Sequence, residues 1–334
     1  MKRRDFFSDL VVGSALLTSS NGAFAQDLAS PEKTTRPQAS DEVVIERPRS
    51  GKPHAGKVLA AIQPHTDDVP IFAGGTVAKL VSEGYTGYLI RTTNDEMAGS
   101  GTTGDRVLNN ERDTEAVAKA LGLQKVFNLE YRNHEMDGIS RLEFRERLIY
   151  LIRLLKIDTI VCYDPWGSYE ENPDHYVTAQ GVEAACWMAG MDRDYPEHLD
   201  GGLQPHAVLE KYYFARGPQL VNRVVDISPW IDHKVEANLA NKTQGPGGEN
   251  GARLREKLSN QKLRLPILGS DDDTANRAYI KYIVLDYDSQ YQRGVPSDKE
   301  IGGRYGLEWA EVFHYISPRQ SQLDGYTSAH AVPL

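Results

Sequence analysis

The chain has 334 residues, of which 40% are hydrophobic, and a formal net charge of −9. This length and composition are typical of a large α/β domain that can bury a sizeable core. An acidic chain without a run of Lys and Arg is poorly suited to bind nucleic acid or anionic lipid, so we expect neither as a partner.

The first residues predict export from the cytoplasm. Residues 2–7 (Lys-Arg-Arg-Asp-Phe-Phe) place paired arginines before aromatic residues, an apolar stretch follows at 10–17, and residues 23–25 (Ala-Phe-Ala) fit a small-x-small cleavage site. The apolar stretch is too short to span a membrane, so we expect no membrane span there. We expect residues 1–25 to be a removable twin-arginine-type signal, with a plain secretory signal as the alternative, and a periplasmic or secreted protein. Residues 26–56 are rich in Pro, Ser and charge, which predicts a flexible linker.

Strand-like and helix-like patterns then alternate through residues 57–320, the predicted domain, and residues 321–334 are a predicted C-terminal tail. This alternation predicts a single α/β domain with a doubly wound, Rossmann-like, mostly parallel sheet. The absence of Gly-x-Gly-x-x-Gly after the first strand argues against a dinucleotide cofactor. The expected strands are 58–63, 86–93, 125–130, 159–163, 208–214 and 223–227, and the expected helices are 75–84, 106–122, 143–156, 178–191 and 229–241.

A histidine and two aspartates follow the first expected strand. His65, Asp67 and Asp68 lie just past its carboxyl end, where open α/β sheets hold their ligands. An imidazole and a carboxylate suit zinc, and the neighbouring Asp67 cannot easily share the same metal face, which leaves it free to take a proton from water. Taken alone, the motif is weak evidence for a metal, and a capping Asp beside a hydrogen-bonded His is the favoured interpretation.

A candidate for a third metal ligand follows the strand expected at 159–163. His175 lies in a loop that leads into the helix expected at 178–191, again past the carboxyl end of a strand. Because the two motifs have matching positions relative to a parallel sheet, they can meet in space.

These two motifs resemble those of the PIG-L/LmbE family of zinc-dependent N-deacetylases. Residues 64–68 (Pro-His-Thr-Asp-Asp) with the glycines at 74–75 match the first family motif, and residues 172–175 (Asn-Pro-Asp-His) match the second with one departure. The resemblance extends over roughly residues 57 to 316, and its ordered features are unlikely to arise by chance. The lesser features are Glu111-Arg112 with Glu115, Leu121-Gly122, Tyr163-Asp164-Pro165, Asp226 to Ser228, Lys234, Lys242 to Gln244, and Trp309 to Phe313.

The resemblance implies that His65, Asp68 and His175 bind Zn²⁺ and that Asp67 is the general base. Three protein ligands leave one position for water, and a nearby carboxylate can remove a proton from that water. Another divalent ion remains possible. For Asp174 the sequence leaves two roles open, namely capping the following helix or orienting a ligand imidazole.

Asn172 stands where the family has a histidine. That histidine is expected to support the oxyanion and to help protonate the leaving amine, whereas Asn can donate a hydrogen bond but cannot titrate. Tyr169, three residues earlier, could donate a hydrogen bond to the oxyanion, or it could be an ordinary loop aromatic. The group that protonates the amine is left open.

By this resemblance, we expect a hydrolase that removes an acetyl or other acyl group from an amino sugar or glycoconjugate. One alternative is an amidase that cleaves a larger sugar amide conjugate. Another is a sugar-binding protein with little turnover, because Asn172 replaces the family histidine. The intact Asp67 argues against this second alternative.

Two further residues are candidate substrate contacts. Asp95 follows the second expected strand at the same edge of the sheet. Arg112 could contact substrate, but it could equally form a helix-surface ion pair with Glu115.

Three other features have more than one interpretation. The long segment 245–300 could form a lid or an oligomer contact, and it begins with the glycine-rich residues 245–248, which we expect to be an ordinary loop. The acidic run 271–273 lacks the ligand spacing of a calcium loop. The chain has two cysteines, Cys162 and Cys186, and we expect both to be buried free thiols.

Overall fold

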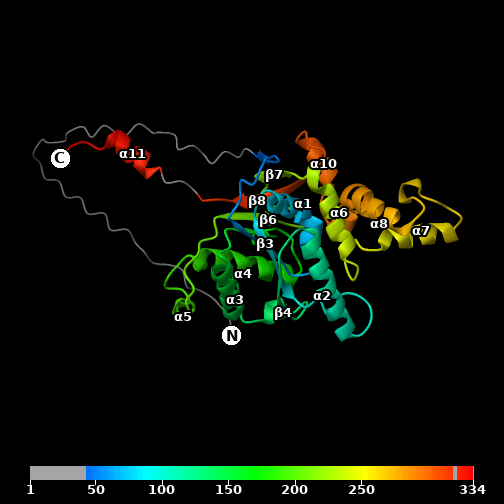
Figure 1. The fold of residues 1–334 in the computed structure, drawn as a ribbon, viewed down its shortest axis with the longest axis horizontal. Coiled ribbons are helices and arrows are strands. Elements are labelled where there is room, and N and C mark those ends of the chain that lie inside the picture. Colours follow the sequence, from blue (N-terminus) through cyan, green and yellow to red (C-terminus); the bar gives the residue numbers. More distant parts are fainter. Residues whose placement is uncertain (1–42, 319–321, 334) are drawn as a thin grey trace, which may run out of the picture. The chain divides into compact units, whose positions relative to one another are not determined.

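The computed structural model describes residues 43–318 and 322–333. The predicted signal at 1–25 and residues 26–42 of the predicted linker lie outside this part of the chain, so export stays a prediction. One eight-stranded sheet forms the centre of the described fold (Figure 1). Its strands are β1 (Val44–Glu46), β2 (Val58–Gln63), β3 (Thr86–Thr93), β4 (Val126–Tyr131), β5 (Thr159–Tyr163), β6 (Glu210–Phe214), β7 (Arg223–Asp226) and β8 (Ala310–Ile316).

The strand order across the sheet is β1-β7-β8-β6-β5-β2-β3-β4. Neighbouring strands are parallel except that β8 runs antiparallel to both β6 and β7. From β2 the chain proceeds to β3 and β4 on one side, and from β5 to β6 on the other, so the order reverses between β2 and β5. Such a reversal opens a ligand-binding crevice beyond the strands' carboxyl ends. The predicted doubly wound, mostly parallel α/β fold is confirmed.

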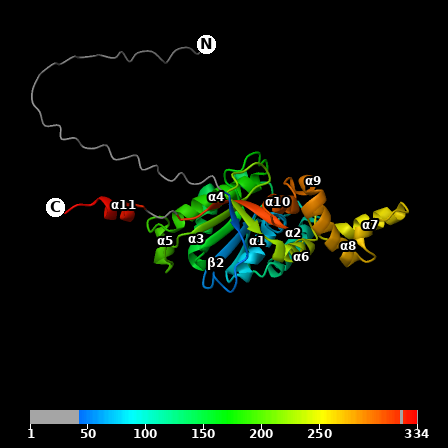
Figure 2. The ribbon, with the colours of Figure 1, turned by 90° about the horizontal axis from the view of Figure 1, so that it is seen from above.

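Helices cover both faces of the sheet (Figure 2). Helices α3 and α4 pack against each other, whereas α6 packs against both α1 and α2. The main helices are α1 (Asp68–Ser82), α2 (Thr103–Ala120), α3 (Arg141–Leu155), α4 (Pro173–Ala189) and α6 (Ile231–Ala240). The others are α5 (Pro196–Asp200), α7 (Asn250–Asn260), α8 (Asp272–Tyr279), a π-helix at Ile280–Tyr287, α9 (Ser289–Arg293), α10 (Asp298–Arg304) and α11 (Leu323–His330).

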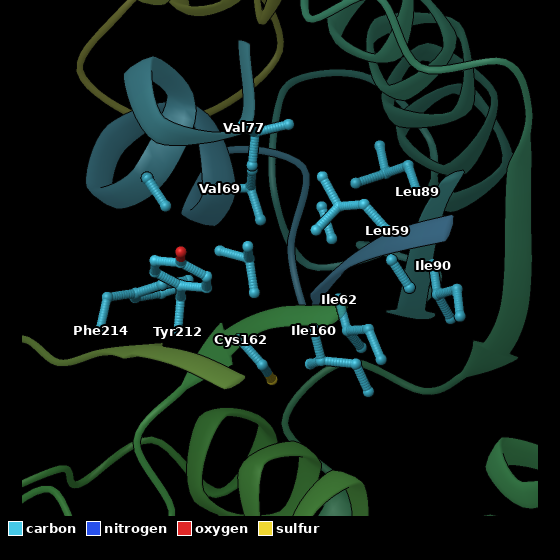
Figure 3. Packing of buried hydrophobic residues seen from close by; sticks show 14 of the residues in the cluster. Leu59, Ile62, Val69, Val77, Leu89, Ile90, Ile160, Cys162, Tyr212 and Phe214 are labelled. Carbon is cyan, nitrogen blue, oxygen red and sulfur yellow. The ribbon is translucent and has the colours of Figure 1, made fainter. Parts of the chain in front are cut away.

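The core lies between the sheet and these helices (Figure 3). Every residue of β5 is buried, and β2 is buried from Leu59 onward, as expected for central parallel strands. On the helical side, Leu148 and Ile152 of α3 are also buried. This burial fixes the ends of β2 and β5, and with them the positions of the residues that follow each strand.

Four helices begin earlier than predicted, and the two largest corrections, at α1 and α4, affect the site. Helix α1 begins at Asp68 instead of residue 75, so the glycine pair lies inside the helix. A Cβ on Gly75 would lie 2.7 Å from Ile227, so close packing against the segment after β7 explains this glycine. Helix α4 begins at Pro173 instead of 178, because Asn172 caps it and proline suits a first turn.

The sheet also contains two strands that were not predicted. Strand β1 pairs with β7 and lies within the predicted linker, so residues 43–56 are part of the fold. Strand β8 lies between β6 and β7. The predicted tail contains α11.

Both cysteines are buried free thiols, as predicted. Among the described residues, we find no helix that is long and apolar enough to cross a membrane.

Candidate active site

Three predicted metal ligands meet beyond the carboxyl ends of β2 and β5. His65 lies in the turn after β2, Asp68 is the first residue of α1, and His175 lies in the first turn of α4 rather than in a loop. One ligand atom from each residue lies within 4.8 Å of the other two, and all three side chains are buried. The two imidazoles approach most closely through Nδ1 of His65 and Nε2 of His175, which are 3.1 Å apart.

The ring of His65 is oriented by Asp174. Oδ2 of Asp174 lies 3.0 Å from Nε2 of His65, on the side of the ring away from the ligand cluster. The same carboxylate accepts hydrogen bonds from the backbone N–H groups of His134 and Met136, which hold it in place. Of the two roles that the sequence allowed for Asp174, the structure selects orientation of the imidazole. Asn172 caps α4 instead, because its Oδ1 accepts from the backbone N–H of Asp174 at 3.0 Å.

A second carboxylate lies behind His175. Oε2 of Glu170 is 3.1 Å from Nδ1 of His175, and Arg216 donates to both oxygens of Glu170, at 3.1 and 2.6 Å. The sequence analysis missed Glu170 and Arg216. The acidic pair at 170–171 just before the second motif was a visible signal, but the pairing with Arg216 depends on tertiary structure.

The carboxylate of Asp68 is held in its charged form. Tyr163, at the end of β5, donates to Oδ1 at 2.7 Å, and the backbone N–H of His65 donates to Oδ2 at 2.8 Å. Burial alone would raise the pKa of Asp68, but the neighbouring histidines and Tyr163 outweigh it and lower the pKa to about 2. Tyr163 was not among the predicted site residues.

This cluster has the donor chemistry of a metal site. Two imidazole nitrogens and one carboxylate are a common set of three protein ligands for a catalytic divalent metal such as zinc. Each imidazole also has a carboxylate at its other nitrogen, the arrangement by which proteins orient ligating histidines. The residues therefore fit a divalent metal ion.

Asp67 lies beside this cluster, but its surroundings differ from those of the three predicted ligands. It precedes α1, yet its side chain makes no capping hydrogen bond, which excludes the capping interpretation. The loop after α6 covers it so closely that a Cβ on Gly245 would lie 2.7 Å from Oδ2 of Asp67, and Gly245 has a φ of +74°. Burial, and then the charge of Asp68, raise the pKa of Asp67 to about 7. A carboxyl group of this kind can exchange a proton near neutral pH.

The cluster opens into a cavity of about 1030 Å³. Asn172 lines it, and Nδ2 of Asn172 lies 3.4 Å from Nε2 of His175. Tyr169 belongs to the cavity lining, with 85% of its surface exposed and a φ of +61°, so it is not the half-buried loop aromatic of the alternative interpretation. His134 also lines the cavity and was missed, because its short loop showed no motif.

The two predicted substrate contacts do not lie with the metal ligands. Asp95 has no exposed surface, and its Oδ2 accepts from the backbone N–H and the hydroxyl of Thr66 at 3.1 and 2.9 Å. Asp95 therefore holds Thr66 of the first motif in place, and its buried side chain does not reach the substrate cavity. Arg112 is exposed on α2 and lines a separate surface hollow with Lys242 and Arg253.

The segment 245–300 forms one wall of the cavity, through residues that range from Gly245 to Gly294. The glycine-rich stretch at its start is a loop, as predicted, but that loop packs on Asp67. Sequence reasoning could not place this wall, because no residue pattern links it to the motifs at 64–68 and 172–175.

Comparisons with known proteins agree with this site. Residues 60–186 match the model of the PIG-L family, described as GlcNAc-PI de-N-acetylase. The diacetylchitobiose deacetylase of Thermococcus kodakarensis is 30% identical over 198 residues, which cover 57% of this chain and 71% of that protein.

Solved structures show the same fold. The N,N'-diacetylchitobiose deacetylase of Pyrococcus horikoshii is similar with a TM-score of 0.59 and 22% identity, over 83% of this chain and 87% of that one. A 4-carboxy-2-hydroxymuconate hydratase from Pseudomonas putida is similar with a TM-score of 0.54 and 15% identity, over 79% and 98%. The second protein has a different activity, so the fold alone does not decide the chemistry. The similarity to the Thermococcus kodakarensis deacetylase, together with the motifs that carry His65, Asp68 and His175, shows that this chain belongs to the PIG-L family.

Proposed function

We propose that this chain is a zinc-dependent hydrolase that removes an acetyl group from the amine of an amino sugar or glycoconjugate. The observation that carries the proposal is the convergence of His65, Asp68 and His175 beside a carboxyl group, Asp67, whose pKa is raised to about 7. The 30% identity to a diacetylchitobiose deacetylase supports the choice of an N-acetylated sugar as substrate.

His65, Asp68 and His175 would hold the metal ion. A zinc ion with three protein ligands lowers the pKa of bound water and polarises a substrate carbonyl. Asp67 then takes the proton of the attacking water, as a general base with a pKa near the working pH can do. The C–N bond breaks, the acetyl group leaves as acetate, and Asp67 holds a proton that can pass to the amine nitrogen.

Two neutral side chains, Asn172 and Tyr169, also line the cavity beside the proposed metal site. The amide of Asn172 can donate a hydrogen bond to the negative charge that develops on the carbonyl oxygen, since its other end is fixed by the cap of α4. The phenol of Tyr169 is a second possible donor on the cavity wall. Neither group needs to titrate to serve in this way.

Acetate release from a panel of N-acetylated sugars tests the proposal. We expect acetate from at least one amino sugar, loss of that activity with a chelator, and its recovery when zinc is added back. Release of a larger acid or amine from a sugar amide conjugate, without acetate from the panel, would instead favour the amidase alternative. Tight sugar binding by the zinc-loaded protein with no product would favour the sugar-binding alternative and contradict the proposal.

A further inference from the structure

We propose that the cavity binds a glycan of several sugar units and that Tyr291 of α9 stacks on a unit beyond the one that is deacetylated. This inference names the size of the substrate and so rests on the proposed function. Its support comes from the shape and lining of the cavity away from the metal ligands.

The cavity is larger than one acetylated sugar requires. Its volume of about 1030 Å³ is at the top of the range of roughly 300–1,000 Å³ that is usual for pockets that hold drug-sized ligands. Besides the metal cluster, its lining includes side chains from Tyr279 and from residues 290–293, which belong to the distant segment 245–300. The mechanism proposed above uses none of these residues.

Two tyrosines on different elements belong to the lining of this cavity and are largely exposed. Tyr169, in the loop after β5, and Tyr291, on α9, both line it, and 85% and 86% of their surfaces are exposed. Large aromatic side chains usually bury most of their surface, so exposed rings on a cavity wall are available to a ligand. A sugar ring has an apolar C–H face edged by hydroxyl groups, which matches an aromatic ring with a polar tip.

The rest of this wall offers neutral hydrogen-bonding groups. Gln290 and Gln292 flank Tyr291 in the chain, and Asn250, from the same segment 245–300, also belongs to the lining. Amide side chains both donate and accept hydrogen bonds, as sugar hydroxyls require. The two nearby guanidinium groups are already paired, Arg216 with Glu170 and Arg293 with Asp298, and the exposed carboxylate of Glu171 also lines the cavity, so the lining does not favour an anionic glycan.

The wall that carries Tyr291 is anchored to the metal-binding helix. Arg293 is 4% exposed, its Nη1 donates to the carbonyl of Ile71 in α1 at 3.0 Å, and its Nη2 pairs with Asp298 at 2.8 Å. A lid that swings away would have to break these buried contacts. The part of the cavity beside Tyr291, the outer subsite, is therefore formed before substrate binds. Little ordering of the protein is required when a glycan binds there.

Binding of N-acetylglucosamine and of chitooligosaccharides up to the hexamer tests the inference, because the single sugar has no unit beyond the one that is deacetylated. We would measure calorimetric affinities with the zinc-loaded Asp67→Asn variant, in which turnover should be slow, and with the same protein carrying Tyr291→Ala or Tyr291→Phe. Tyr287→Ala is the matched control, because Tyr287 is 91% exposed and lies outside the cavity lining.

We expect the oligosaccharides to bind roughly three- to tenfold more tightly than N-acetylglucosamine, the gain typical of one aromatic contact. Tyr291→Ala should remove this gain, whereas Tyr291→Phe and Tyr287→Ala should keep it. An affinity that does not change with length, or a gain that persists in Tyr291→Ala, would overturn the inference. Acetate release by the wild-type protein that is equal at every length would also overturn it while the proposed function stands. Length-dependent binding without any acetate release by the zinc-loaded wild-type protein would support the subsite and contradict the proposed deacetylation.

Discussion

Oδ2 of Asp174 lies 3.0 Å from Nε2 of His65, while Nδ1 of the same ring lies 3.1 Å from Nε2 of His175. A proton on Nε2 satisfies Asp174 and leaves the lone pair of Nδ1 directed at the ligand cluster. The carboxylate of Asp174 thus selects the tautomer that can bind a metal.

Replacement of Asp174 by Asn should weaken metal binding without unfolding the protein. The amide can still accept hydrogen bonds, but it no longer stabilises the orientation and basicity of His65, so we expect a loss of roughly 10- to 100-fold in zinc affinity. Competition titration with a chromophoric chelator measures this loss. Asp158→Asn is the control, because Asp158 faces His206 at 3.2 Å at the opposite end of β5. Equal zinc affinity in the wild type and Asp174→Asn would show that Asp174 does not orient the ligand.

Glu170→Gln should have a similar effect through His175. Glu170 is fixed by Arg216 and lies 3.1 Å from Nδ1 of His175, so its charge supports the second imidazole. We expect zinc affinity to fall roughly tenfold or more in the same titration. Glu171→Gln, which removes the same charge from a neighbour that is 83% exposed, should leave zinc affinity unchanged. A fall of the same size in both variants would indicate a general charge effect instead.

Asn172 should set the pH dependence of activity. Burial and the charge of Asp68 raise the pKa of Asp67, whose carboxylate must be unprotonated to act as a base, so kcat/KM should rise with pH as Asp67 or the zinc-bound water loses its proton. Asn has no proton to lose. We therefore expect that kcat/KM does not fall again at higher pH with an apparent pKa of about 6.5, the ordinary value of histidine. Asn172→His should introduce a falling limb above neutrality, and Asn172→Ser, which keeps a capping oxygen, should not.

A falling limb in the wild type that Asn172→His leaves unaltered would contradict this role. His134, the remaining imidazole of the cavity lining, would then be the candidate acid.

The stability of the folded protein at low pH should depend on Glu46 in β1, a strand that was not predicted from the sequence. Burial raises the pKa of Glu46 in β1, but Lys79 at 2.8 Å, with Tyr212 and Arg223, outweighs it, so the pKa lies below the usual 4.5. A lowered pKa in the folded state means that the stabilisation is present above about pH 4.5 and is lost as the pH falls below that value.

Glu46→Gln should therefore lower the free energy of unfolding by about 2 kcal/mol at neutral pH, the usual contribution of a hydrogen bond to a charged group. Urea denaturation across a pH series measures the difference, which should shrink as the pH falls below 4.5. The exposed Glu256→Gln is the control. A difference that stays constant down to pH 3 would contradict the assignment.

The sequence predicted the fold where local pattern and burial agree. The apolar strands at 58–63 and 159–163 indicated that the motifs after them could meet, and the family resemblance then predicted His65, Asp68 and His175 as the ligand set. Strand β1 has three residues in a polar segment, and its place depends on pairing with β7, which no local pattern reveals.

The same limit applies to the site. The partners of Asp174 and Glu170 and the loop at Gly245 lie far from each other in the chain, so only the folded structure brings them to the metal ligands. Asp95 was correctly placed at the right edge of the sheet, but its side chain points inward to Thr66, and that orientation depends on packing beneath the first motif.

The most direct test of the account is the zinc content and deacetylase activity of Asp67→Asn. Because we propose that Asp67 is the base and not a ligand, we predict about one zinc per chain, as in the wild type, with kcat lower by roughly a hundredfold or more. His175→Ala, which removes a ligand, should lose most of the zinc in the same metal analysis. Retention of activity in Asp67→Asn at full zinc content would contradict the assignment of Asp67 as the general base, and full zinc in His175→Ala would contradict the ligand set.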